Sequence, residues 1–457
     1  MGKQGTYLNG LLKKRSHTRS LKPLHAPPFP HPELLKKEKI NSGRLAKIIG
    51  SIRRIDAVNP HTRITRLAFS NNEDRALGIV KNAMQKNGLS AWYDSFGNLH
   101  GQYGSGAQKP VMISSHLDTV HKGGAFDGLA GVAVGLEALL SIKDSGIRTK
   151  RPIKLVIFRG EESVSFGKPS LGSNAAIGEL TAKDLARKHA FLEGNRTLRS
   201  LLSSRGLKYY PDQKIITPHN TQSNLELHVE QGGKLARSRT SRIAVVDRIA
   251  GSNRFSLEFT GEATHSGATE MGVKNRRDAL LAASKAALLA DELARQESKR
   301  LGTDIKATVT DLKVVDANLT AVPGKVLARV DVRGVNERQR EAFVRKLLRR
   351  IKEQSGENRV DIKFNQISKS SPGRLHSTVK SAIRRAAQKT GFAQELRTLD
   401  SGAGHDAIVL STVIPSGMIF IPSEGGLSHN SREKTYFSDL QKGTILAKHT
   451  LIELANK

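Results

Sequence analysis

Four short apolar runs constrain the fold of this chain more than any other feature. They are PVMIS (110–114), IKLVIF (153–158), LELHV (225–229) and GMIFI (417–421). Continuous apolar runs of this length are typical of strands that are buried on both faces of a sheet. Helical patterns separate the runs, most clearly over 128–143. This alternation predicts an α/β domain with a mostly parallel sheet and helices on both of its faces.

The pattern changes between about residues 242 and 363. Here strand-like stretches alternate apolar and polar residues, and two amphipathic helices interrupt them at 278–295 and 337–354. This order of strands and helices suits a ferredoxin-like α+β unit. A chain of 457 residues is also too long for one compact core. We therefore predict a catalytic domain, 33–241 and 364–457, that is split by a smaller lid and dimerisation domain.

The first 32 residues contain several basic residues and no acidic one. This composition predicts a flexible basic arm, and it lacks the continuous apolar core of a secretory signal. No apolar stretch approaches the roughly 20 residues that are needed to cross a bilayer. We expect a cytoplasmic protein, and the basic arm leaves organellar targeting open as an alternative.

The formal net charge of +32 is the strongest argument for a nucleic-acid partner or another anionic surface. The basic residues are, however, spread along the chain, and aromatic residues make up only 5% of it. Few aromatic side chains are therefore present for stacking on bases. A generally basic proteome or an attraction for anionic substrates also explains the charge, so we do not expect nucleic acid to be the main ligand.

The absence of cysteine restricts any metal site to histidine, aspartate and glutamate. The segment SSHLDTVHKGGAFDG (114–128) offers such residues directly after an apolar run. Asp118 lies two residues after His116 and can accept its ring N–H, which would fix the tautomer for metal binding. Asp127 sits in a glycine-rich turn that lets the backbone bend around an ion.

The other three apolar runs also end at potential ligands. Glu161 and Glu162 follow one run, and two adjacent carboxylates repel each other unless a cation or proton intervenes. His228 lies within a second run, and a glycine turn after the fourth run leads to His429. In open α/β sheets, ligands bind beyond the carboxyl ends of the strands. The residues therefore predict a pair of divalent ions, with one glutamate as ligand and its neighbour working on a water.

The motifs at these positions resemble those of the hydantoinase/carbamoylase family of dinuclear metal amidohydrolases. That family is a branch of the aminoacylase/carboxypeptidase-like metallopeptidases. The resemblance implies that His116 and His228 hold one metal, that Glu162 and His429 hold the other, and that Asp127 bridges them. The motifs that carry it are TRLAFSNNED (65–74), DSFGNLHG (94–101), SSHLDTVHKGGAFDG (114–128), GEES (160–163), ELHVEQG (226–232), GEATHSGATEM (261–271), VPGKVLARVDVRG (322–334), SGAGHDA (401–407) and GGLSH (425–429).

The resemblance also implies roles for five further residues. Glu161 would be the general base, and His265 would reach from the lid into the active site of a partner subunit in a homodimer. Arg333 would bind a substrate carboxylate, and Gln231 would recognise the substrate amide. Thr320 stands where many members carry a substrate-binding asparagine, which is a departure from the family pattern.

The implied activity is hydrolysis of a C–N bond in an N-carbamoyl amino acid or a related ureido acid, such as allantoate or ureidopropionate. Two divalent ions, either zinc, manganese, cobalt or nickel, would lower the pKa of a bridging water. An aminoacylase or dipeptidase with the same dinuclear site is the alternative enzyme. A basic protein that binds nucleic acid or a surface is the alternative from another class.

Overall fold

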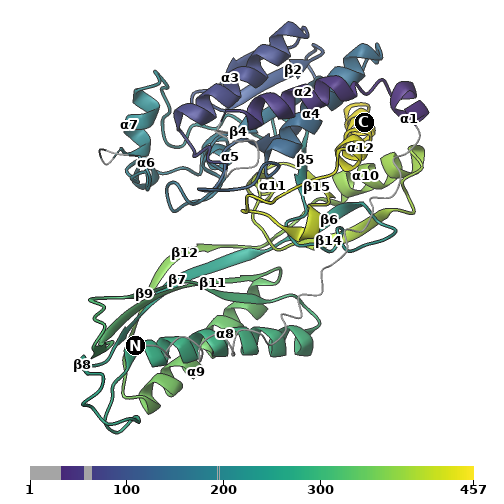
Figure 1. The fold of residues 1–457 in the computed structure, drawn as a ribbon. Coiled ribbons are helices and arrows are strands. Elements are labelled where there is room, and N and C mark those ends of the chain that lie inside the picture. Colours follow the sequence, from purple (N-terminus) through teal and green to yellow (C-terminus); the bar gives the residue numbers. More distant parts are fainter. Residues whose placement is uncertain (1–31, 56–63, 193, 195) are drawn as a thin grey trace, which may run out of the picture.

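The computed structural model describes residues 32–55, 64–192, 194 and 196–457 (Figure 1). The predicted basic arm therefore lies outside the described residues, apart from Pro32. The described chain forms a larger α/β domain and an elongated smaller domain that extends away from it (Figure 1). No helix among the described residues is both long enough and apolar enough to span a bilayer.

A nine-stranded sheet forms the centre of the larger domain. Its order is β1-β2-β4-β3-β5-β15-β6-β13, and β14 also pairs with β6. The central strands β4, β3, β5 and β15 are parallel, and antiparallel pairs extend the sheet on both sides. This confirms the prediction of a mostly parallel centre. The strands are β1 (Ser90–Tyr93), β2 (Leu99–Tyr103), β3 (Val111–His116), β4 (Ile153–Phe158), β5 (Ser223–Val229), β6 (Ile243–Ile249), β13 (Gly373–Arg374), β14 (Leu396–Ser401) and β15 (Ser416–Ile421).

Helices cover both faces of this sheet, as predicted. On one face α4, α10 and α12 pack on the central strands, α3 packs on β1 and β2, and α2 packs against α3 and α4. On the other face α5 and α11 pack together against β4, β5 and β15. The central strands are buried on both sides because helices cover both sides. The helices are α1 (Pro32–Lys37), α2 (Ser42–Arg53), α3 (Asn71–Lys86), α4 (Leu129–Asp144), α5 (Leu171–Ile177), α6 (Ala182–Leu185), α7 (Leu198–Ser203), α10 (Ser377–Lys389), α11 (Asp406–Leu410), the short 3-10 helix η1 (Glu424–Gly426) and α12 (Phe437–Ala455).

The smaller domain is a four-stranded antiparallel sheet with two long helices on one face (Figure 1). The chain order β7, α8, β9, β11, α9, β12 and the sheet order β12-β7-β11-β9 give the ferredoxin-like arrangement that the sequence predicts. A short β8-β10 ribbon lies at the far end. The elements are β7 (Gly251–Thr260), β8 (Thr264–His265), α8 (Ala279–Leu301), β9 (Lys306–Val314), β10 (Ala321–Val322), β11 (Lys325–Gly334), α9 (Glu337–Glu357) and β12 (Asp361–Ser370).

The division between the two sheets differs from the predicted limits of 242 and 363. Strand β6 hydrogen-bonds to strands of the large sheet, and the small sheet runs from Gly251 to Ser370. The reason is visible in the burial of β6: residues 243–246 are fully buried in succession, whereas β7 alternates. Continuous burial is typical of a strand covered on both faces, which only the larger domain provides.

Helix α4 approaches the sheet closely at Gly131. A Cβ atom added there would lie 2.1 Å from the Leu227 carbonyl oxygen and 2.5 Å from Ser115 Oγ. This contact joins the helix that follows Asp127 to the strands that carry His116 and His228. Glycine is therefore required by close packing at this position.

We predict that Gly131→Ala lowers the free energy of unfolding by about 1–3 kcal/mol, because the helix must move away from β5. Gly78→Ala is a matched control, since an added Cβ on α3 meets nothing within 4 Å. It should raise stability by about 0.5–1 kcal/mol through the higher helix propensity of alanine. Urea denaturation measures both variants. Equal effects would contradict the packing argument.

Candidate active site

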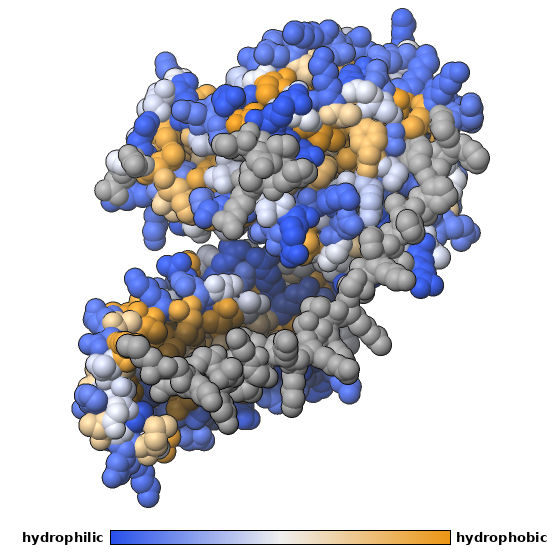
Figure 2. All heavy atoms as spheres, in the orientation of Figure 1, coloured by the Kyte–Doolittle hydropathy of each residue, from blue (hydrophilic) through white to orange (hydrophobic). Residues whose placement is uncertain are grey.

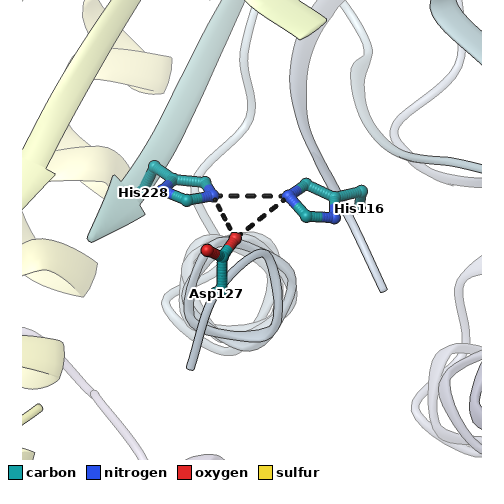
Figure 3. A group of neighbouring side chains, drawn as sticks. All are labelled: His116, Asp127 and His228. Carbon is teal, nitrogen blue, oxygen red and sulfur yellow. Dashed lines mark hydrogen bonds and ion pairs between the residues drawn. The ribbon is translucent and has the colours of Figure 1, made fainter. Parts of the chain in front are cut away.

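Three side chains meet at the carboxyl ends of β3 and β5 (Figure 3). His116 is the last residue of β3, His228 lies near the end of β5, and Asp127 lies two residues before the first residue of α4. The two Nε2 atoms are 3.3 Å apart, and Asp127 Oδ1 lies 3.1 Å from His228 Nε2 and 3.5 Å from His116 Nε2. All three side chains are almost fully buried. Their ligand atoms thus surround one point.

Asp127 also belongs to a second group of ligand atoms. His429 Nε2 lies 3.5 Å from Asp127 Oδ2 and 3.0 Å from Glu162 Oε1. One oxygen of Asp127 therefore faces the first group and its other oxygen faces the second. The structure brings all five predicted ligand residues together, with Asp127 between the two groups.

The charges of these donor residues suit divalent cations. Burial opposes a charge on His429, but the neighbouring Glu162 carboxylate raises the pKa of His429 to about 9. Burial likewise opposes a charge on His116, yet the carboxylates around it raise its pKa well above the usual range. Buried carboxylates this close together require positive charge. Protons supply that charge in the chain alone, and bound divalent ions can take the place of the protons. A set of imidazoles and carboxylates suits borderline divalent ions.

Asp118 connects the two halves of the site. Its carboxylate accepts the backbone N–H groups of Glu161 and Glu162, each at 3.0 Å. His116 Nδ1 lies 3.1 Å from the backbone carbonyl of Asp118 and 3.4 Å from its carboxylate. The carbonyl is thus the nearer acceptor for the His116 ring, and the carboxylate mainly fixes the two glutamates.

Glu161 is buried beside the ligands, with 8% of its surface exposed. Burial raises the pKa of Glu161 well above its usual range, and the Glu162 carboxylate adds to this effect. Its Oε1 atom accepts a hydrogen bond of 3.3 Å from Ser170 Oγ. A buried carboxylate with a raised pKa, adjacent to a ligand, can act as a general base.

A further network of hydrogen bonds supports Asp127. Gln231 Nε2 and Ser428 Oγ each lie 2.6 Å from Asp127 Oδ2. Glu433 accepts the backbone N–H groups of Phe126 and Asp127 at 2.6 and 2.8 Å. Gln231, predicted to bind the substrate amide, therefore contacts the shared carboxylate in this structure. Sequence reasoning missed Ser428 and Glu433, although both lie within five residues of His429.

Two lid arginines face the catalytic domain. Arg333 donates from Nε and Nη2 to Asp331 Oδ2 at 3.0 and 2.9 Å, and from Nη1 to the Gly402 carbonyl at 3.1 Å. Arg254, on the neighbouring strand, lies 3.3 Å from the same Asp331 oxygen, and its Nη1 is 3.5 Å from Ser163 Oγ. Only Arg333 was predicted. Figure 2 shows a hydrophilic hollow between the two domains.

The other predicted lid residues lie away from this cluster. His265 is on β8 and Thr320 directly precedes β10, in the ribbon at the far end of the lid (Figure 1). Both are exposed. His265 Nδ1 accepts the N–H groups of Gly267 and Ala268 at 3.1 and 3.0 Å, which orients the ring. Within one chain, neither His265 nor Thr320 therefore contributes to the two groups of ligand atoms around Asp127.

Comparison with known proteins identifies the class. A family model described as peptidase family M20/M25/M40 matches residues 112–453. The chain is 32% identical to an N-carbamoyl-L-amino acid amidohydrolase of Geobacillus stearothermophilus, over 87% of this chain and 94% of that protein. It is 30% identical to a ureidoglycolate hydrolase of Oryza sativa subsp. japonica, over 84% and 79%. An amidase of the hydantoinase/carbamoylase family from Burkholderia multivorans has a similar structure, with a TM-score of 0.79, 27% identity and coverage of 92% and 98%.

The chain therefore belongs to the M20/M25/M40 peptidase family, whose members are metal-dependent. Within that family it falls in the hydantoinase/carbamoylase branch, and it is a hydrolase of carbon–nitrogen bonds other than peptide bonds. The resemblance that the sequence motifs indicate is confirmed.

We predict that Asp118→Asn weakens metal binding roughly 10- to 100-fold. Asparagine keeps one acceptor oxygen but turns an NH₂ group toward the other glutamate N–H, so the two glutamates lose their common anchor. Asp144→Asn, at the end of α4 and 39% exposed, is the control and should bind metal normally. Titration with a competing chelator measures the affinity. Unchanged affinity in Asp118→Asn would contradict the anchoring role.

Proposed function

We propose that this protein hydrolyses the C–N bond of an N-carbamoyl amino acid or a related ureido acid, such as allantoate or ureidopropionate. The main support for the proposal is the position of Asp127, whose carboxylate belongs to two groups of ligand atoms. The ureido substrates named for the relatives support the choice of substrate class.

The proposed cofactor is a pair of divalent ions, either zinc, manganese, cobalt or nickel. His116, Asp127 and His228 would hold one ion, and Asp127, Glu162 and His429 the other. When bound, the ions would supply Lewis acidity and lower the pKa of a water in the site. These donors contain no thiolate, and imidazole and carboxylate ligands do not by themselves select one of the four metals.

Glu161 is the proposed general base. It would take a proton from the attacking water and later deliver it to the nitrogen that leaves. Two features of the chain favour this role. Burial raises its pKa, and the Asp118 carboxylate holds its backbone beside Glu162.

Arg333 is proposed to bind the substrate carboxylate, and Arg254 lies beside it. The two guanidinium groups share the single carboxylate of Asp331, so the three side chains carry a surplus of one positive charge. One substrate carboxylate would balance that surplus. Arginine also presents a planar pair of donors that matches a carboxylate. Gln231 and, beside His265, Thr320 of the partner subunit are the other proposed substrate contacts.

We further propose a homodimer in which His265 completes the site of the partner subunit. His265 lies at the end of the lid that is remote from its own catalytic domain (Figure 1). Its Nδ1 atom is held by two backbone N–H groups, so Nε2 is the atom that faces outward. A donor at Nε2 could stabilise the oxyanion that develops at the carbonyl.

An aminoacylase or dipeptidase with the same ligand residues is the second enzyme that the site allows. The branch of the family favours ureido substrates, because both relatives named above act on such compounds by name. A panel of N-carbamoyl, N-acyl and dipeptide substrates, together with allantoate, separates the two activities by their products.

Replacement of the proposed base tests the mechanism. Glu161→Gln should keep its metal but lose at least roughly a hundredfold in kcat on N-carbamoyl amino acids, from the usual size of general-base effects. Ammonia release measures turnover, and elemental analysis measures metal content. Glu357→Gln, an exposed change at the end of α9, is the control. Normal turnover in Glu161→Gln would reject the assignment of the base.

Subunit mixing tests the shared site. Glu161→Gln and His265→Ala should each be nearly inactive alone. After dissociation and mixing they should recover about a quarter of wild-type turnover, because half of the dimers are mixed and each mixed dimer holds one complete site. A His265→Ala chain mixed with the Glu161→Gln/His265→Ala double variant should recover nothing. No recovery in the first mixture would show that His265 does not act across subunits.

A further inference from the structure

Ser170 is an unusual residue next to the general base that we propose. Its backbone is left-handed, with φ 55° and ψ 44°, a conformation that disfavours every residue with a Cβ atom. It is also buried, with 3% of its surface exposed. Glycine would relieve the strain at this position, so the presence of a serine requires a reason.

Helix capping does not supply that reason. Ser170 stands at the N-cap of α5, where a serine usually accepts an N–H group of the first helical turn. Here its side chain makes no capping hydrogen bond. By contrast Ser70, Thr181 and Thr197 are N-caps in extended conformation, and each of them does cap its helix. The left-handed backbone of Ser170 turns its hydroxyl away from the helix.

The hydroxyl is directed to Glu161 instead. Ser170 Oγ donates to Glu161 Oε1 at 3.3 Å, and the Ser170 backbone N–H donates to the Glu161 carbonyl at 2.8 Å. The next two residues continue this pairing, since Leu171 N–H donates to Gly160 and Gly172 N–H to Arg159, both at 2.8 Å. Ser170 therefore contacts the side chain and the main chain of the same glutamate, on a segment that is itself fixed.

We infer that Ser170 is a positioning residue for the Glu161 carboxylate, and this inference rests on the proposed function. Asp118 fixes the backbone of Glu161, but only a contact to the carboxylate restricts its rotation. The Ser170 hydroxyl provides that contact at Oε1. It holds the carboxylate in one orientation relative to the ligand residues, and precise orientation of a base is worth a measurable factor in rate. Backbone strain is retained at Ser170 because the hydroxyl is needed there.

Two variants separate this role from a purely structural one. Ser170→Gly and Ser170→Ala both remove the hydroxyl, but only alanine keeps the strained Cβ atom. We expect kcat to fall about three- to tenfold in both, the scale of one lost hydrogen bond, with KM and metal content unchanged. The Tm should differ between them: at or above the wild-type value for glycine, and below the glycine variant for alanine.

The control is Asp212→Gly. Asp212 is another left-handed residue, with φ 68°, but it is exposed and makes no contact with the ligand groups among the described residues. It should gain stability without any change in kcat.

The inference is overturned if both Ser170 variants keep the wild-type kcat while Glu161→Gln is slow. It is also overturned if Ser170→Gly recovers the activity that Ser170→Ala loses, since strain and not the hydroxyl would then be responsible. A wild-type enzyme that hydrolyses none of the substrate panel, or a fully active Glu161→Gln, would instead overturn the proposed function and this inference with it. Failure of the inference and failure of the proposed function are distinguishable. The first two results require an active wild type and a slow Glu161→Gln variant, and the last two do not.

Discussion

The position of the Asp127 carboxylate is the constraint on which the site depends. Its two oxygens face different groups of ligand atoms, so a small rotation would disturb both groups at once. Several contacts prevent that rotation. Glu433 accepts the Asp127 backbone N–H, and Ser428 contacts Oδ2. Gly128 follows with a positive φ of 65°, and a Cβ there would lie 2.5 Å from the His116 carbonyl. The chain thus fixes its central acid through groups from both ends of the catalytic domain.

The acidity of this region explains why its supports are backbone N–H groups and hydroxyls. Five acidic side chains are buried close together at this site, and burial alone penalises the charged form of each. They are Asp118, Asp127, Glu161, Glu162 and Glu433. Every one of them accepts a hydrogen bond or faces an imidazole. Such an arrangement is stable only when cations or protons offset the remaining repulsion. The polar network and the proposed ions therefore support each other: the network orients the ligands, and positive charge makes their burial tolerable.

The sequence predicts the fold and the ligand cluster because both follow local rules. Four apolar runs give the parallel strands, and the topology of a parallel sheet brings residues such as His116 and Glu162 to one edge. The supports of the site do not follow local rules. Glu433 contacts a backbone N–H 306 positions away, and Arg254 and Arg333 meet only through the register of two lid strands. The sequence predicts strand β6 as part of the lid because it neighbours alternating strands, although its four consecutive apolar residues, 243–246, match the large sheet. The unusual backbone of Ser170 has no signal in sequence, since serine is common in ordinary turns.

The insertion of the lid between β6 and β13 has a consequence for how the protein works. Both flanking strands belong to the large sheet and pair with each other, so the lid leaves and returns at one place. Arg333 and Arg254 lie near that junction, where they contact Gly402 and Ser163 of the catalytic domain. His265 lies in the separate β8-β10 ribbon at the far end of the lid, away from the ligand residues of its own chain (Figure 1). In the proposed dimer, one lid therefore offers carboxylate-binding groups to its own catalytic domain and a histidine to a second molecule. A monomer would leave the histidine unused, which makes dimerisation a requirement of the proposed chemistry and not a means of stabilisation.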